Sequence, residues 1–252
     1  MRWLLSVVLI FALACGDEDR EPFLPGGGGG GGSSETATDG GTPDGGDDLL
    51  FRGVLCAVTD VRKLDQCNAN PDGLEVRIGT VSATSTAGGQ VELALGPNDD
   101  LVDVLVSDPN GAYRPVIWRG SVFPVAGQDS VVIPVVSSAT MTTIEGVLGE
   151  GPSDNVGTVI AHINKVGEPL AGAQIAEPVV GALGGIYYGV PDSPYLDIGA
   201  GTGLFGVAAH FGLPTAGPTV QLLVKEDSGA TPVSVEVPVA DNAVSFISYD
   251  FP

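Results

Sequence analysis

Short apolar segments bounded by Gly, Pro, Asn or Asp recur from residue 49 onward, and they constrain the fold more than any other feature. Residues 90–95 and 233–237 alternate between apolar and polar side chains. A period of two places one set of side chains on one face of a strand. We expect further strands at 101–106, 131–136, 156–163, 205–211 and 220–224. Many short strands between turns are typical of β-sandwiches, so the sequence predicts an all-β fold without a long helix.

The length of this region suggests how the strands are organised. Residues 49–252 suffice for two sandwiches of roughly 100 residues each. We expect two tandem Ig-like β-sandwich domains, 49–138 and 139–252, divided near the short polar segment 137–140. One large sandwich is the alternative.

The N-terminal segment has the pattern of an export signal. Arg2 supplies a positive charge, and residues 3–14 carry no charge. Such a stretch is too short to cross a membrane as a helix, which needs about 20 residues. It fits the apolar part of a secretory signal peptide.

The end of this segment, Ala12-Leu13-Ala14-Cys15-Gly16, resembles a bacterial lipobox. The resemblance implies removal of residues 1–14, a lipid on Cys15, and attachment to the cell envelope, with Gly16 permitting sorting to the outer membrane. Stable attachment takes two or more acyl chains. An ordinary signal peptide with an incidental Cys15 and an uncleaved anchor are the alternatives.

Residues 15–48 lack the side chains that a folded core requires. They contain seven consecutive glycines, 26–32, followed by Ser, Thr, Gly and Asp residues. Glycine loses the most entropy on ordering, and like charges repel. We expect a disordered tether with a reach of about 30 Å.

The later part of the chain resembles a known domain family. Residues 158–175 read as a strand, a Gly turn and Pro169-Leu-Ala-Gly-Ala173, and Thr202–Phe205 follows after an insertion. This order is similar to the carboxypeptidase regulatory-like domain. Residues 73–93 are similar to the same hairpin. The resemblance implies transthyretin-like, seven-stranded sandwiches without peptidase activity.

Two cysteines remain if Cys15 carries lipid. Cys56 and Cys67 lie close in sequence, and disulfides persist in exported proteins. A metal site would need more ligands than two cysteines, and no histidine lies near them in sequence. We therefore expect a Cys56–Cys67 disulfide.

The sequence carries no motif typical of catalysis. The two histidines, His162 and His210, lie in apolar segments and outside any zinc motif. No Gly-x-Ser-x-Gly or phosphate-binding loop occurs. A net charge of −21 disfavours nucleic acid as a partner. We expect no enzyme, no cofactor and no metal, although weak calcium binding by Asn98, Asp99, Asp100 and Asp103 stays open.

Residues 178–198 form a Gly- and Pro-rich segment with Tyr187, Tyr188 and Tyr195. Tyrosines on loops often contribute to recognition, which makes this segment a candidate interaction surface. The alternative is that these rings cover the core of their own domain.

Together these features predict a non-catalytic lipoprotein that displays β-sandwich modules at the bacterial cell envelope. Its expected partners are the membrane, through the lipid, and an unidentified protein or glycan. A carbohydrate- or peptide-recognising accessory module of an envelope enzyme system is the alternative.

Overall fold

The computed structural model of the chain describes residues 49–64, 66–95, 101–124, 128–151, 155–191 and 195–252. The predicted signal peptide 1–14, the tether 15–48 and Cys15 lie outside these residues. So do Asn98, Asp99 and Asp100 of the possible calcium site. None of the described residues belongs to a helix that is both long and apolar enough to cross a membrane.

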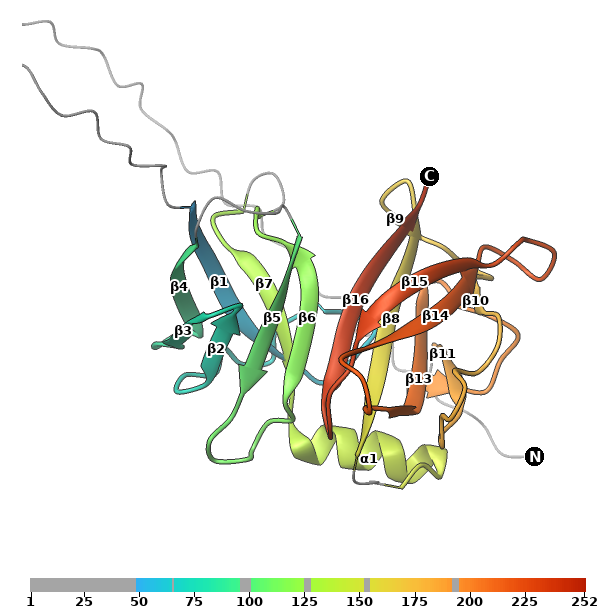
Figure 1. Ribbon diagram of the computed structural model, residues 1–252, viewed down its shortest axis with the longest axis horizontal. Coiled ribbons are helices and arrows are strands. Elements are labelled where there is room, and N and C mark those ends of the chain that lie inside the picture. The colour runs from blue at the N-terminus through green and yellow to red at the C-terminus, as the bar shows by residue number, and fades with distance from the viewer. Residues whose placement is uncertain (1–48, 65, 96–100, 125–127, 152–154, 192–194) are drawn as a thin grey trace, which may run out of the picture. The chain divides into compact units, whose positions relative to one another are not determined.

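The described chain is all-β, as the sequence predicts, with a single short helix among its described residues (Figure 1). The elements before residue 150 are β1 (Leu49–Val58), β2 (Glu75–Ile78), β3 (Val81–Thr84), β4 (Gln90–Leu95), β5 (Leu101–Ser107), β6 (Val116–Ser121), β7 (Val131–Val136) and α1 (Ser138–Leu148). Those after it are β8 (Val156–Lys165), β9 (Glu168–Pro169), β10 (Gln174–Ile175), β11 (Ile186–Gly189), β12 (Leu196–Asp197), β13 (Val207–Pro214), β14 (Thr219–Lys225), β15 (Val233–Pro238) and β16 (Val244–Phe251).

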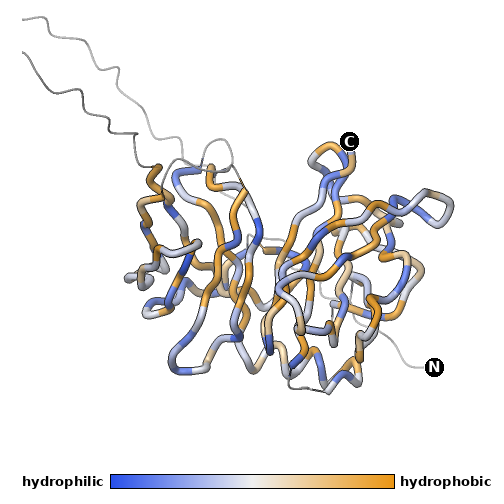
Figure 2. The backbone as a smooth tube through the Cα atoms, viewed as in Figure 1, coloured by the Kyte–Doolittle hydropathy of each residue, from blue (hydrophilic) through white to orange (hydrophobic). Residues whose placement is uncertain are grey.

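Alternation in the sequence becomes alternation in burial along the strands. In β4 the side chains of Val91, Leu93 and Leu95 are buried, and the residues between them are exposed. Every segment predicted as a strand is one. The predicted and observed bounds differ most at 205–211, where β13 begins at Val207 and ends at Pro214. Figure 2 shows the apolar residues concentrated along the strands.

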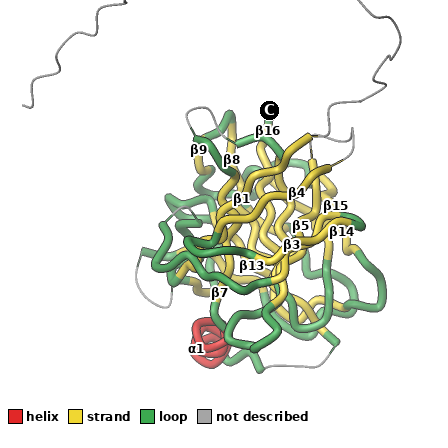
Figure 3. The backbone as a smooth tube through the Cα atoms, turned by 90° about the vertical axis from the view of Figure 1, so that its left-hand side faces the viewer, coloured by secondary structure: helices red, strands yellow, loops and turns green. Residues whose placement is uncertain are grey.

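Helix α1 begins inside the segment predicted as a domain boundary. Ser137 caps its N-terminus, because the Ser137 side chain accepts a hydrogen bond from the Thr140 N–H at 3.0 Å. Gly149 ends the helix with a φ of 74°, a left-handed conformation that favours glycine. Met141 and Ile144, three residues apart, are buried on one face of the helix. Figure 3 shows α1 at one end of the strands.

The strands of the described residues pair into three sheets. Two are three-stranded, with the orders β4-β1-β7 and β10-β14-β15. The third is ten-stranded and follows the path β12-β11-β13-β8-β16-β6-β5-β2-β3, with β9 added beside β8. Strand β16 lies between β6 and β8 and is parallel to both. The largest sheet therefore contains strands from before and after residue 138, and the number of domains stays a prediction.

The buried side chains form two hydrophobic clusters. The larger cluster combines residues from before and after residue 138, for example Phe51 and Ile133 with Ile160 and Phe246. The smaller one fills the space between β8, β13 and β16 on one side and β14 and β15 on the other, and includes Leu222. Each cluster lies between two sheets, which is the packing of a β-sandwich.

Candidate functional site

The predicted disulfide is confirmed. Cys56 and Cys67 are bonded, with their Cα atoms 4.9 Å apart and 11 positions apart in the sequence. Cys56 is fully buried at the end of β1. The disulfide closes a loop that includes Asp60 and Arg62.

Arg62 connects this loop to distant parts of the chain. Its Nε and Nη2 donate to the two carboxylate oxygens of Asp60 at 2.8 and 2.7 Å. Its Nη1 donates to the backbone carbonyls of Val190 and Pro191. Burial acts to raise the pKa of Asp60, but hydrogen bonds and charge from Arg62 outweigh it and hold the pKa below its usual value. Such a buried, bidentate pair holds the two loops together.

Tyr195 packs against the same guanidinium group. The Arg62 Cζ lies 4.3 Å from the Tyr195 ring centroid and 4.7 Å from that of Phe205. These distances are typical of cation–π contacts. The Tyr195 ring therefore has a partner within the chain.

The other two tyrosines of the candidate interaction surface are core residues. Tyr187 and Tyr188 are each only 6% exposed. The Tyr187 ring meets Phe211 edge to face, with centroids 5.5 Å apart. The Tyr188 hydroxyl lies 3.2 Å from the Ile175 nitrogen, which donates to it. Because both rings cover the core, they do not offer the surface that the sequence suggested. An interaction through the rest of segment 178–198, whose Val180 is exposed, stays a prediction.

The two histidines make different hydrogen bonds. The His162 Nε2 is 3.1 Å from the Val61 carbonyl oxygen. His210 is fully buried: its Nε2 accepts from the Val179 N–H at 3.1 Å, and its Nδ1 lies 3.0 Å from the Phe211 carbonyl. An Nδ1–H tautomer satisfies both contacts, so the ring is neutral. Burial lowers the pKa of His210 below its usual value.

Asp103, the described member of the possible calcium site, is engaged elsewhere. Its two carboxylate oxygens accept from Nε and Nη2 of Arg119 at 2.6 and 2.7 Å. Across the described ranges there is no group of three or more His, Cys, Asp or Glu side chains that could hold a metal ion.

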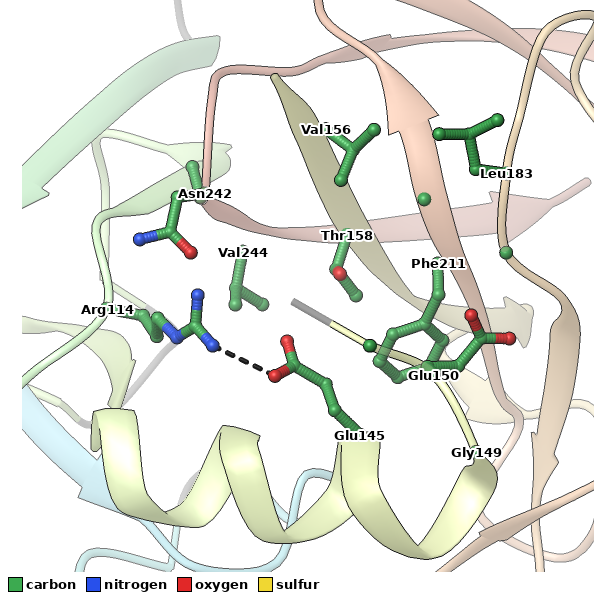
Figure 4. Close-up of a pocket in the computed structure, with 14 residues that line it drawn as sticks. Arg114, Glu145, Gly149, Glu150, Val156, Thr158, Leu183, Phe211, Asn242 and Val244 are labelled. Carbon is green, nitrogen blue, oxygen red and sulfur yellow. Dashed lines mark hydrogen bonds and ion pairs between the residues drawn. The ribbon is translucent and has the colours of Figure 1, made fainter. Parts of the chain in front are cut away.

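A polar cavity lies between α1 and the strands that follow it (Figure 4). Its volume is about 310 Å³, within the range of small-molecule sites. The side chains that line it come from the loop before β6, from α1, from β8 and β13, and from the turn before β16. They include Arg114, Glu145, Glu150, Thr158, Phe211 and Asn242.

An ion pair occupies the floor of this cavity. Arg114 Nη2 donates to Glu145 Oε2 at 2.9 Å, and each side chain is only 11% exposed. Burial raises the pKa of Glu145, Arg114 opposes that effect, and Glu150 adds to it. A carboxylate and a guanidinium therefore face one small space (Figure 4).

Glu150 lies at the other end of the cavity. Its Oε1 accepts from the Gly185 N–H and from the Tyr187 hydroxyl, both at 2.7 Å. Burial raises the pKa of Tyr187 to about 12, and the hydrogen bond and charge of Glu150 contribute. Tyr187 thus fixes the position of a cavity carboxylate.

Sequence reasoning missed this site. Its polar residues are scattered from Arg114 to Asn242, and no local motif connects them. The one local signal is Glu145, a charged residue next to Ile144 on the buried face of α1. That signal is readable only if the helix itself is expected.

Comparisons with known proteins add little. No family model and no curated protein matches the chain. Among solved structures, the Bacillus anthracis TIE protein matches with a TM-score of 0.23 and 11% identity, over 80% of this chain and 33% of that chain. The chain thus spans about a third of the length of that protein, and so weak a likeness carries no argument about fold or function.

Proposed function

We propose that the protein is a lipid-anchored, non-catalytic component of the bacterial cell envelope, attached through Cys15. The observation that carries the proposal is the order of the N-terminal sequence. An uncharged segment, residues 3–14, ends in Ala14-Cys15-Gly16 and is followed by the Gly- and Asp-rich residues up to 48. The Cys56–Cys67 disulfide supports an exported location, where such bonds persist.

The role of the folded part in this proposal is binding rather than chemistry. The two carboxylates at the cavity already have partners: Glu145 pairs with Arg114, and Glu150 accepts from Tyr187. His210, buried and hydrogen-bonded to the backbone, does not line the cavity. Because these carboxylates are held by partners, the contacts support a site that binds a ligand rather than one that transfers protons.

The carboxypeptidase regulatory-like relationship is part of this proposal. The β8–β9 turn at Val166 and Gly167 has positive φ values of 52° and 80°, as a tight two-residue turn requires. Gly172, with a φ of 87°, precedes β10. This strand–turn–strand order supports the resemblance of residues 158–175 to that family.

Metabolic labelling with a palmitate analogue in a bacterial host tests the anchor. We expect the full chain to carry the label and to fractionate with membranes, and Cys15→Ser to lose both properties. Because lipidation precedes cleavage in this pathway, the wild-type chain should also lose residues 1–14.

The matched control is the double variant Cys56→Ser/Cys67→Ser, which keeps Cys15 and should keep the label. Equal labelling of Cys15→Ser and wild type, or an unlabelled wild type, would contradict the proposal.

The cavity favours a second candidate function, an accessory module that recognises a carbohydrate or peptide for an envelope enzyme. Its polar lining and small volume suit a hydrophilic ligand. Co-purification with one enzyme of the envelope, lost in an Arg114→Gln variant, would support this role.

A further inference from the structure

Several polar atoms at the cavity have no partner within the described residues. Arg114 donates only from Nη2, so its Nε and Nη1 have no acceptor among the described residues. Glu145 accepts only at Oε2, so its Oε1 has no donor among them. The Thr158 residue is only 8% exposed, and its hydroxyl makes no hydrogen bond to the described chain. All three groups line the same space.

The unpartnered atoms themselves are open to solvent in the cavity, because no buried side-chain nitrogen or oxygen atom of the described residues lacks a hydrogen-bond partner. The side chains of Arg114 and Glu145 are about nine-tenths buried, and the Thr158 residue is buried to a similar degree. Water can satisfy these atoms, and a ligand that displaces this water has to replace its hydrogen bonds. The cavity therefore has defined positions for hydrogen-bond donors and acceptors of a guest.

The free donors and the free acceptors are separated along the cavity. Figure 4 shows Arg114 beside Asn242 at one end, Glu145 and Thr158 in the middle, and Glu150 at the other end. Arg114 and the Asn242 amide can donate to an anionic group. Glu145 Oε1, Thr158 Oγ1 and the second oxygen of Glu150 can accept from a cationic group. A ligand of only one charge would leave one of these sets unpaired.

We propose that the cavity binds a small zwitterion of the α-amino-acid class, with its carboxylate at Arg114 and Asn242 and its ammonium group at Glu145 and Thr158. The N–H donors of an ammonium group suit Glu145 Oε1 and Thr158 Oγ1. The inference rests on the binding role proposed above, and it does not depend on the lipid anchor. It assigns a chemical class to the ligand. The side chain of the bound amino acid would contact the rim of the cavity, where Leu183 is exposed.

The test uses the full chain with Cys15→Ser, so that it can be purified without detergent. Binding of the twenty standard L-amino acids is measured by isothermal titration calorimetry at pH 7. The tightest binder is then compared with its methyl ester, which lacks the carboxylate, and with its N-acetyl derivative, which lacks the ammonium group. Glucose serves as a neutral probe of similar size.

We expect at least one amino acid to bind, and both derivatives to bind at least tenfold more weakly. Glu145→Gln keeps an acceptor for Arg114 but removes the charge, and should weaken binding about tenfold. Thr158→Val, which is nearly isosteric, should weaken it several-fold. Glu92→Gln is the matched control, because Glu92 forms an exposed ion pair with Arg52 outside the cavity, and it should change affinity less than twofold.

Three results would overturn the proposal. The first is that no amino acid binds. The second is that the methyl ester binds as tightly as the parent amino acid, which would indicate a simple cation site. The third is that the Thr158→Val and Glu92→Gln variants bind with equal affinity. Thermal unfolding of each variant establishes that it is folded. None of these outcomes depends on Cys15, so a failure here is distinct from a failure of the anchor.

Discussion

At the scale of single residues, the charged and titratable side chains that are buried in the described part of the chain have hydrogen-bond partners. Arg62 binds Asp60 and two backbone carbonyls, and Arg114 binds Glu145. His210 also has hydrogen-bond partners, but it differs from these charged groups because it is buried as a neutral ring. A group buried in its neutral form makes stability depend on pH.

We predict that the protein loses stability as the pH falls below about 6.5 and that His210 is a cause. The folded pKa of His210 is lowered, so the unfolded chain binds its proton first. The stabilisation is therefore complete above pH 6.5 and is lost as the pH falls from there through the folded pKa. Urea unfolding at pH 8 and pH 6 measures this loss.

The comparison is with His210→Gln, which does not titrate and keeps an acceptor for the Val179 N–H. Its free energy of unfolding should change less between pH 8 and pH 6 than that of the wild type. Identical changes would contradict the prediction. Asp60 and Asp108 have lowered pKa values, so they affect stability only near pH 3.8 and below, outside this range.

At the scale of elements, sequence patterns predicted strands better than the helix. Strands such as β4 alternate over six residues, and that local pattern is enough to place them. Helix α1 contains Thr140, Thr142 and Thr143, which have low helix propensity, and only two apolar residues mark its buried face. Its N-cap and C-cap were readable at Ser137 and Gly149, but the polar segment was interpreted as a boundary.

We predict that Ser137→Ala lowers the free energy of unfolding by about 1 kcal/mol, because it removes the side-chain acceptor for the Thr140 N–H. Chemical denaturation followed by circular dichroism measures the change. Thr142→Ala is the control: the described chain gives that side chain no hydrogen bond, and alanine favours a helix. A loss in Thr142→Ala as large as in Ser137→Ala would count against capping as the cause.

At the scale of the whole molecule, the cavity was beyond the reach of sequence analysis. Arg114 precedes β6, Glu145 lies on α1, and Thr158 lies on β8, so only the pairing of distant strands brings them together. Local periodicity carries no information on such pairing. The disulfide was predictable because two cysteines in an exported chain leave little choice of partner.

We predict that reducing the Cys56–Cys67 bond lowers the free energy of unfolding by about 2.5–3 kcal/mol, the chain-entropy value for a loop of this length. Guanidinium unfolding with and without a thiol reductant measures the difference. The reductant should leave the double variant Cys56→Ala/Cys67→Ala unchanged. An unchanged unfolding midpoint for the reduced wild type would contradict the prediction and would show that the contacts around Arg62 hold the loop without the disulfide.

Strand β16 lies between β6 and β8, which are not paired with one another in the sheet. Val244–Ile247 pair with Val116–Arg119 of β6, and all of β16, Val244–Phe251, pairs with Thr158–Lys165 of β8. If this strand detached, two rows of unsatisfied backbone groups would be uncovered together, and each would attract the same extended segment from another copy of the protein. The position of β16 thus makes strand exchange between copies the foreseeable route by which this fold would misassemble.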